Sequence, residues 1–300
     1  MGPLTHRTPK HLLEVAGEPF LVHQLRWLAG HGVRDVVLAT SYLARAFAPV
    51  LGDGGRLGVR LRYAVEPTPR GTGGGVASAA RLLDTPADAP LVVVNGDLLT
   101  RHDLSAQLAL ARGRGEPPDA VLHLRSVPDA RRYGCVLANA DGVVTAFLEK
   151  SPAPPSHEVN GGTYVLRRSV LDGIPDGVVS LERDVLPDLV ARGRVLAHRE
   201  QGLWEDVGTP AALVRASRVL VESSGAGARV DPTAVVDASA TLSGGSAIGP
   251  WAVVEAGATV LGSVVMRGAR VSARAGVRDC IVGPGAVIPG GTLLEGGVVC

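Results

Sequence analysis

The stretch VVVNGDLL, residues 92–99, is an apolar run that ends in a turn carrying a carboxylate. Three valines followed by Asn95-Gly96-Asp97 are typical of a buried β-strand that stops at a turn. Where strands alternate with helices, ligands bind beyond the carboxyl ends of the strands. We therefore expect Asp97 at a ligand-binding edge, although for a single aspartate a purely turn-forming role is the alternative.

Segments with helical and strand spacing alternate on both sides of this strand. Helices are expected at 19–28, 42–51, 73–83, 103–112 and 209–221, and strands at 33–40, 59–65, 91–95, 119–125, 134–139, 143–149 and 161–166. This alternation predicts an α/β fold with a doubly wound, mostly parallel, Rossmann-like sheet covered by helices.

Lysine is scarce, since Lys10 and Lys150 are the only two among 30 basic Lys and Arg residues. Arginine presents a planar fork, whereas lysine is a compact point charge that fits a crowded phosphate. We interpret both lysines as phosphate contacts, with chance survival of two surface lysines as the alternative.

Asp206, in WEDVGTP (204–210), ends a second strand-like run as Asp97 does. Two converging carboxylates suit a Mg²⁺ ion shared with substrate phosphates.

Eight sequence blocks occur in a fixed order along the first 220 or so residues. They are TPKHLLEVAGEPF (8–20), EPTPRGTGGG (66–75), VVVNGDLL (92–99), RYG (132–134), FLEK (147–150), NGGTYVL (160–166), SLERDVLP (180–187) and WEDVGTP (204–210). In this order they resemble the sugar-1-phosphate nucleotidyltransferase (NDP-sugar pyrophosphorylase) family. Such enzymes condense a nucleoside triphosphate with a sugar 1-phosphate and release pyrophosphate.

The resemblance implies a role for particular residues of this sequence. Asp97 and Asp206 would hold Mg²⁺, and the catalytic set would be Lys10, Asp97, Lys150 and Asp206. The nucleotide would contact Lys10, Glu66, Gly71, Thr72 and Gly96. The sugar or cyclitol 1-phosphate would contact Tyr133, Gly134, Glu149, Lys150 and Asn160. Glu205 is left out because neighbouring residues of a strand point to opposite faces.

Both reactants are polyanions, so neutralising and aligning their phosphates is the main catalytic requirement. The blocks GTGG (71–74) and NGG (160–162) resemble guanylyltransferases that act on mannose, heptose or C7-cyclitol phosphates. GTP is therefore the favoured donor, with adenylyl or thymidylyl transfer as the alternative.

The beginning of the chain departs from the family pattern. Family members start with a strand and a Gly-rich loop, GGxGTRL, whereas this sequence starts at MGPLT (1–5), which matches the family residues just after that loop. We expect the first strand and the loop to be encoded upstream. A noncatalytic regulatory paralogue is the alternative, opposed by the presence of Lys10, Asp97, Lys150 and Asp206.

Beyond residue 225 the sequence changes to a six-residue period. Apolar residues recur at Val230, Val236, Leu242, Ile248, Val254 and Val260, and again at Val282, Ile288 and Leu294. This hexapeptide period predicts a left-handed parallel β-helix of about four coils, with bulged corners between Met266 and Val282 where the spacing slips to five. The expected domains are 1–222 and 228–300. A bifunctional enzyme that also acetylates is the alternative use of this fold, but that chemistry generally needs a histidine base and the last histidine of the chain is His198. We therefore expect the β-helix to be an assembly or regulatory surface, with homo-oligomers formed through it.

Composition excludes several classes of function. A net charge of +1 and 3% aromatic residues offer little to a nucleic acid. No apolar run reaches the roughly 18 residues of a membrane span, and no signal-peptide pattern is present. The three cysteines are widely spaced, which favours reduced thiols in the cytoplasm. We expect His102 and His157 to face solvent or to lie behind the site rather than act in catalysis.

Overall fold

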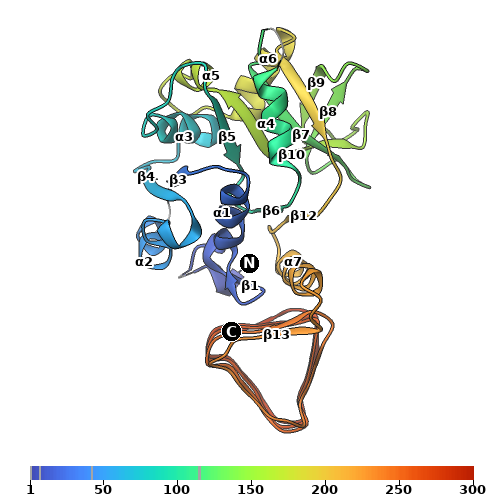
Figure 1. Cartoon of the computed structure of the whole chain (residues 1–300). Helices are drawn as coiled ribbons and strands as arrows, with labels where there is room; N and C mark the ends of the chain where they lie inside the picture. The colour runs from blue at the N-terminus through green and yellow to red at the C-terminus, as the bar shows by residue number, and fades with distance from the viewer. Residues whose placement is uncertain (1, 7, 42, 114–115) are drawn as a thin grey trace. The chain divides into compact units, whose positions relative to one another are not determined.

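The computed structural model describes residues 2–6, 8–41, 43–113 and 116–300 (Figure 1). Spatial contacts divide the chain into two compact units. Unit 1 comprises Met1–Gln24, Asp97–Leu99 and Glu205–Cys300, and unit 2 comprises Leu25–Gly96 and Thr100–Trp204. The sequence-based domain limits at 222 and 228 stay a prediction, and each unit is described by itself.

Unit 2 is built on a six-stranded sheet of order β11-β7-β10-β8-β9, in which β5 also pairs with β10. The strands are β5 (Pro90–Val94), β7 (Ala120–Ser126), β8 (Gly134–Ala138), β9 (Val144–Glu149), β10 (Glu158–Arg167) and β11 (Val195–Arg199). The expectation of a mostly parallel sheet is corrected here: β10 runs antiparallel to β5, β7 and β8, and β11 is parallel to β7. The sheet is mixed because β10 lies between β5 and β7 and runs in the opposite direction.

Side chains alternate between the two faces of the sheet along each strand, and apolar residues occur on both faces. Helices therefore cover both faces. Val121 and Val165 form a core with Leu104 and Leu108 of α4 (Leu104–Arg112), which lies across β7 and β10 in Figure 1. Leu122, next to Val121 on β7, points to the opposite face of the sheet. There it belongs to the larger core, which the sheet forms with α3, α5, η5 and α6. These elements are α3 (Gly71–Ala80), α5 (Arg168–Asp172), the π-helix η5 (Leu181–Val185) and α6 (Leu186–Ala191).

The remaining elements of unit 2 lie before α3. Strands β3 (Asp35–Thr40) and β4 (Arg60–Val65) pair in parallel as a separate two-stranded sheet. The expected helix at 42–51 is η3 (Ala44–Ala46) followed by α2 (Phe47–Leu51), and Tyr42 lies outside the described residues. The 3₁₀-turn η4 (Gly55–Leu57) precedes β4, and α1 (Phe20–Gly30) leads into the unit.

In unit 1, residues 228–300 form the predicted parallel β-helix, whose coils have a triangular outline in Figure 1. Its strands are β13 (Ala228–Val230), β14 (Val235–Val236), β15 (Thr241–Ser243), β16 (Ser246–Ile248), β17 (Val253–Val254), β18 (Thr259–Leu261), β19 (Val264–Val265), β20 (Arg270–Val271), β21 (Gly276–Arg278), β22 (Ile281–Val282), β23 (Val287–Ile288), β24 (Leu293–Glu295) and β25 (Val298–Val299). Three register rows run along the β-helix, and their side chains fill its interior except for Val230 of the first coil, which is 42% exposed. The rows are Val230, Ile248, Val265, Val282 and Val299; Val236, Val254, Val271 and Ile288; and Leu242, Val260, Val277 and Leu294.

The expected bulged corners are corrected by this register. The inward residue after Val260 is Val265, not Met266, and Val277 is followed by Val282. One corner of each later coil is thus one residue shorter, and residues there adopt a positive φ, as Gly262 (56°) and Asp279 (51°) do. Glycine and aspartate tolerate this left-handed conformation, so each coil closes without disturbing the inward rows.

The rest of unit 1 brings the N-terminal segment to the β-helix. After η1 (Gly2–Thr5) and η2 (Lys10–Leu12), β1 (Glu14–Val15) and β2 (Glu18–Pro19) form a hairpin. Short strands β6 (Leu98–Thr100) and β12 (Trp204–Asp206) pair with each other, and α7 (Pro210–Ser223) follows. Thr209 caps α7 by accepting a hydrogen bond from the Ala212 N–H. Among the described residues, no helix is both long enough and apolar enough to cross a membrane.

Candidate active site

Unit 1 brings together three of the residues expected in the site. Lys10 opens η2, Asp97 precedes β6, and Asp206 ends β12. The Lys10 Nζ lies 2.5 Å from Asp97 Oδ2, and each side chain is about one-third exposed. The Val207 N–H donates to the Asp97 carbonyl over 2.9 Å, so the turn after Asp206 lies directly beside Asp97. A charge-assisted contact of this kind fixes the direction of both side chains while leaving them open to a ligand.

The residues present fit a Mg²⁺ ion rather than a cage that binds metal by itself. No group of three or more His, Cys, Asp or Glu side chains in the described part of the chain is arranged to hold a metal. Mg²⁺ is commonly held by one or two carboxylates together with substrate phosphates and water. Asp97 and Asp206 supply such a pair of oxygen donors on neighbouring backbone segments.

In unit 2, three of the residues expected at the nucleotide, Glu66, Gly71 and Thr72, lie in or against the first turns of α3. The Oε1 atom of Glu66 is buried without a hydrogen-bond partner in the part of the chain that is described, and it lies 2.8 Å from where a Cβ on Gly75 would be. Gly71 has a φ of 71°, and a Cβ there would lie 2.5 Å from the Val179 carbonyl oxygen. Glycine is therefore required at position 71, whereas a Cβ at position 75 would displace only the Glu66 carboxylate. Gly96 lies in the turn after β5.

Two of the N-terminal N–H groups of α3 are used within the protein. The Gly73 N–H donates to the Val179 carbonyl over 2.8 Å, and the Gly74 N–H is within 3.3 Å of the same oxygen. A helix N-terminus binds an anion through such N–H groups. Since these two N–H groups are engaged here, they do not form a phosphate cradle.

The expected sugar-phosphate residues lie at the ends of β8 and β9. Gly134 pairs with Glu149, and a Cβ on Gly134 would lie 3.0 Å from Glu149 Oε2 and 2.7 Å from Phe147. Burial raises the pKa of Glu149, and the neighbouring Lys150 opposes this. Lys150 has a φ of 50°, and its Nζ, 3.7 Å from Glu149 Oε1, belongs to a side chain that is 62% exposed. The Tyr133 carbonyl accepts the Lys150 N–H, so these residues form one short rim.

A hydrogen-bond network that the sequence reasoning missed links Asn160 to Thr72. Asn160 Nδ2 donates to the Tyr164 hydroxyl over 2.7 Å, and this hydroxyl donates to Glu182 Oε1 over 3.1 Å. Thr72 Oγ1 donates to Glu182 Oε2 over 2.6 Å. One carboxylate therefore ties a residue expected at the nucleotide to one expected at the sugar. Glu182 lies in the block SLERDVLP (180–187), which was the available signal.

Trp204 is a second residue that the sequence reasoning missed. Its Nε1 donates to the Gly161 carbonyl over 2.9 Å, and its ring lies edge-on to Tyr133 at a centroid distance of 5.4 Å. The Arg125 guanidinium stacks over the same ring. Trp204 thus contacts both the irregular stretch of β10 between Asn160 and Tyr164 and the residue Tyr133 that precedes β8.

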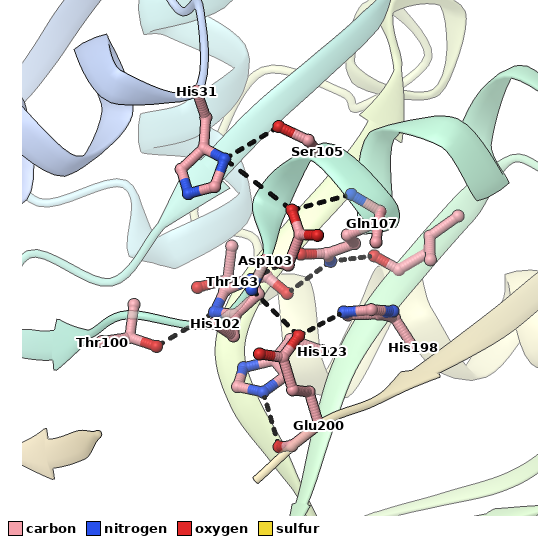
Figure 2. A network of polar contacts seen from close by, with 12 residues as sticks. His31, Thr100, His102, Asp103, Ser105, Gln107, His123, Thr163, His198 and Glu200 are labelled. Carbon is pink, nitrogen blue, oxygen red and sulfur yellow. Dashed lines mark hydrogen bonds and ion pairs between the residues drawn. The ribbon is translucent and has the colours of Figure 1, made fainter. Parts of the chain in front are cut away.

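A stack of buried histidines lies behind this stretch of β10 (Figure 2). The rings of His102 and His123 are 3.8 Å apart and nearly parallel. His123 Nε2 donates to the Glu200 carbonyl, so its Nδ1 carries no proton, and a Cβ on Gly161 would lie 2.4 Å from that Nδ1. Burial lowers the pKa of His102 to about 4 and that of His123 to about 3.

His102 is buried behind β10, which is the second of the two positions expected for it, whereas His157 is exposed. Gln107 Nε2 donates to two backbone carbonyls, so Gln107 Oε1 accepts a hydrogen bond from His102 Nε2. His102 Nδ1 then accepts from the Thr100 hydroxyl. With their pKa values lowered to about 4 and about 3, His102 and His123 are neutral near pH 7 and support β10 from behind.

Comparison with known proteins gives a consistent set of similarities. A nucleotidyl transferase family model matches residues 1–223. The chain is 39% identical over 285 residues to a mannose-1-phosphate guanylyltransferase of Mycobacterium tuberculosis, covering 91% of this chain and 78% of that protein. It is 33% identical over 298 residues to a mannose-1-phosphate guanylyltransferase catalytic subunit beta of Drosophila pseudoobscura, covering 94% and 80%. The crystal structure of HddC from Yersinia pseudotuberculosis complexed with GMP-PN matches 71% of this chain and 90% of its own, with a TM-score of 0.61 and 24% identity.

Proposed function

Because the chain belongs to the nucleotidyl transferase family and is a sugar-1-phosphate nucleotidyltransferase, we propose that it transfers guanylyl from GTP to mannose 1-phosphate or a related sugar or cyclitol 1-phosphate. The observation that carries this proposal is the 39% identity to a mannose-1-phosphate guanylyltransferase over most of the chain. The cluster of Lys10, Asp97 and Asp206 supports it, since one cation beside two carboxylates is a combination suited to nucleotide phosphates and Mg²⁺.

The proposed reaction uses charge and position rather than a covalent intermediate. A phosphate oxygen of the sugar 1-phosphate attacks the α-phosphorus of GTP, the bond to the bridging oxygen breaks, and pyrophosphate leaves. Lys10 neutralises the nucleotide phosphates, and Lys150 neutralises the sugar 1-phosphate. Asp97 and Asp206 would hold Mg²⁺, which supplies further positive charge to the phosphates. Glu149 and Asn160 orient the sugar hydroxyls.

Glu66 supports the choice of guanine. Guanine presents two adjacent donors, N1–H and the N2 amino group, to a carboxylate, whereas uracil and thymine present one N–H and adenine only its amino group. Glu66 is a half-buried carboxyl, and its Oε1 has no hydrogen-bond partner within the described ranges. A bidentate, charge-assisted pair with guanine would satisfy it and discriminate against the other bases.

Two parallel measurements test the activity and the base. We expect pyrophosphate release from GTP and mannose 1-phosphate to exceed that from ATP, UTP or dTTP, and release from no pair of substrates would contradict the activity. Glu66→Gln should raise the KM for GTP at least about tenfold, because hydrogen bonds to charged groups contribute roughly 1.5–3 kcal/mol. An unchanged preference for GTP in Glu66→Gln would remove Glu66 from base recognition.

The same proposal includes where the enzyme works and how it assembles. Cys135, Cys280 and Cys300 are free thiols in the structure, which supports the proposed cytoplasmic location. Homo-oligomers through the β-helix are proposed because its surface bears exposed apolar side chains such as Val235 and Val287.

A further inference from the structure

We propose that Glu14 is a positioning residue for Lys10: its carboxyl, seated against Gly249 in a corner of the β-helix, holds the loop that carries Lys10. This inference deepens the proposed function and rests on it for the role of Lys10. It assigns a catalytic purpose to the β-helix, whose first coils would form part of the framework of the site.

The Glu14 carboxyl is enclosed by the β-helix. The side chain is only 17% exposed, and its Oε2 is buried with no hydrogen-bond partner in the described part of the chain. A Cβ on Gly249 would lie 2.6 Å from this Oε2, so glycine is required for the carboxyl to occupy its place. Arg267 Nε lies 3.9 Å from Oε1. Burial raises the pKa of Glu14 and Arg267 opposes this, so the carboxyl keeps its place mainly through the shape of its surroundings.

Two further contacts anchor the same hairpin. Glu18 Oε2 lies 3.6 Å from an Arg229 guanidinium nitrogen of the β-helix. The Ala16 N–H donates to Ser217 Oγ of α7 over 2.9 Å, and it does so at the tip of the hairpin, where Ala16 has a φ of 49°. A non-glycine residue at such a φ is strained, and it persists only when its surroundings fix it.

The segment that joins Lys10 to the hairpin is short and is held by backbone hydrogen bonds at both ends. The Leu13 N–H donates to the Lys10 carbonyl over 3.2 Å, and the Phe20 N–H donates to the Leu13 carbonyl over 2.9 Å. Leu12 and Leu13 are buried, so the segment cannot slide between its ends. A displacement of Glu14 is therefore transmitted to Lys10 and to its contact with Asp97.

The β-helix also fixes the position of Asp206, through helix α7. Helix α7 begins just after Asp206, packs against β16 of the β-helix, and carries the Ser217 that holds Ala16. The β-helix thereby sets where Lys10 lies relative to Asp206. A purely stabilising role for Glu14 predicts that its loss lowers stability and leaves the environment of Lys10 unchanged in the folded protein.

The scarcity of lysine provides a test in the full-length protein. Acetylation by a limiting amine-reactive reagent, followed by mass spectrometry, measures Lys10 against Lys150 as an internal reference. In Glu14→Ala and in Gly249→Ala, which disturb the contact from opposite sides, we expect the Lys10/Lys150 labelling ratio to rise several-fold. We expect kcat for pyrophosphate release to fall about tenfold, since misplacement by about 1 Å can cost up to a hundredfold. The KM for the sugar 1-phosphate should stay unchanged.

Matched variants separate the contact from general damage to the β-helix. Glu255→Ala removes another carboxylate paired with an arginine of the β-helix, and Gly227→Ala adds a methyl group with nothing within 4 Å of it. Both should behave as the parent protein does. Glu14→Gln keeps the shape of the side chain and should retain most of the parent's labelling ratio and rate. The double variant Glu14→Ala/Gly249→Ala should be no worse than the poorer single variant, because both remove one contact.

The outcomes distinguish this inference from the proposed function. A parental labelling ratio in folded Glu14→Ala would overturn the positioning role even if melting temperature falls. Additive losses in the double variant would also overturn it. A parent protein that releases no pyrophosphate would contradict the proposed function, while the labelling ratio would still report whether Glu14 holds Lys10.

Discussion

Lys10 and Lys150 occupy different surroundings, although the sequence suggested the same role for both. Lys10 is held against Asp97, whereas Lys150 projects from the end of β9 in a left-handed conformation. We expect Lys10→Arg to impair use of the nucleotide and Lys150→Arg to impair use of the sugar phosphate, because the larger guanidinium displaces the phosphate by about 1 Å and costs up to about a hundredfold. Steady-state kinetics with each substrate varied checks this, and two variants with parental kinetics would contradict it.

The two aspartates give a second prediction at the residue scale. Asp97→Asn and Asp206→Asn keep the side-chain shape but remove the charge that would hold Mg²⁺. We expect each to lower kcat by about 10²–10³ while changing the free energy of unfolding by only about 1 kcal/mol. Pyrophosphate release and thermal melting should be measured on the same preparations. Near-parental turnover in either variant would place that aspartate outside the site.

The positions of single residues that end strands could be predicted from the sequence. The hydrogen-bond network around Glu182 could not. Asp97 follows an apolar run, and Asp206 ends the short strand-like stretch WED (204–206), so the end of a strand is readable from the local pattern at both. Glu182 gains its role by meeting Thr72, a residue 110 positions away, and the Tyr164 hydroxyl. Such a meeting depends on how helices and strands pack, which no local pattern specifies.

At the scale of elements, the buried histidines behind β10 make stability depend on pH. Burial lowers the folded-state pKa of His102 to about 4 and that of His123 to about 3, while an unfolded histidine titrates near 6.5. The unfolded chain therefore binds more protons below pH 6.5, so stability is full above that pH and is lost as the pH falls toward 4 and 3. We expect the free energy of unfolding to drop by several kcal/mol over this range.

Thermal melting between pH 7.5 and 4.5 checks this expectation. His123→Gln removes one of the two titrations, so its melting temperature should decline less steeply than that of the parent. His157→Gln, which replaces an exposed histidine, serves as the control and should keep the parental slope. Equal slopes in all three proteins would show that the buried histidines do not govern acid stability.

Helices and strands with a regular spacing of apolar residues were predicted closely. Short elements whose conformation depends on packing against the rest of the fold were not. The helix expected at 103–112 is α4 (Leu104–Arg112), and the strand expected at 119–125 is β7 (Ala120–Ser126). The π-helix η5 carries Glu182 in a short charged stretch with little apolar periodicity, and it was not foreseen. The hairpin of β1 and β2 was missed because two-residue strands have no period to detect.

At the scale of the whole molecule, the outward face of the β-helix predicts self-association. Val235, Val253, Arg270 and Val287 form one register row across β14, β17, β20 and β23, and Val235 and Val287 are 64% and 54% exposed. We expect Val235→Lys/Val287→Lys to weaken a homo-oligomer about tenfold or more, because buried like charges oppose association. Sedimentation velocity measures this, with Val178→Lys, at an 80% exposed site of unit 2, as the control. A parent protein that is monomeric at every concentration would contradict the assembly.

The general architecture was readable from the sequence, but strand direction was not. Alternating periods indicated α/β, and the six-residue period indicated the parallel β-helix that the structure contains. Antiparallel β10 inside the main sheet could not be foreseen, because the apolar pattern of a strand carries no direction.

The constant register of the later coils has a genetic consequence. Val265 pairs with Val282 and Val282 with Val299, so one turn of the β-helix corresponds to one fixed length of coding sequence. An in-frame duplication from Met266 through Val282 would insert a complete coil whose corners and inward residues already match those on either side. Because each coil contacts mainly its neighbours, such a duplication would leave the coils beside Glu14 in place. This part of the gene can therefore gain whole turns by unequal recombination while the lysine and the aspartates keep their positions.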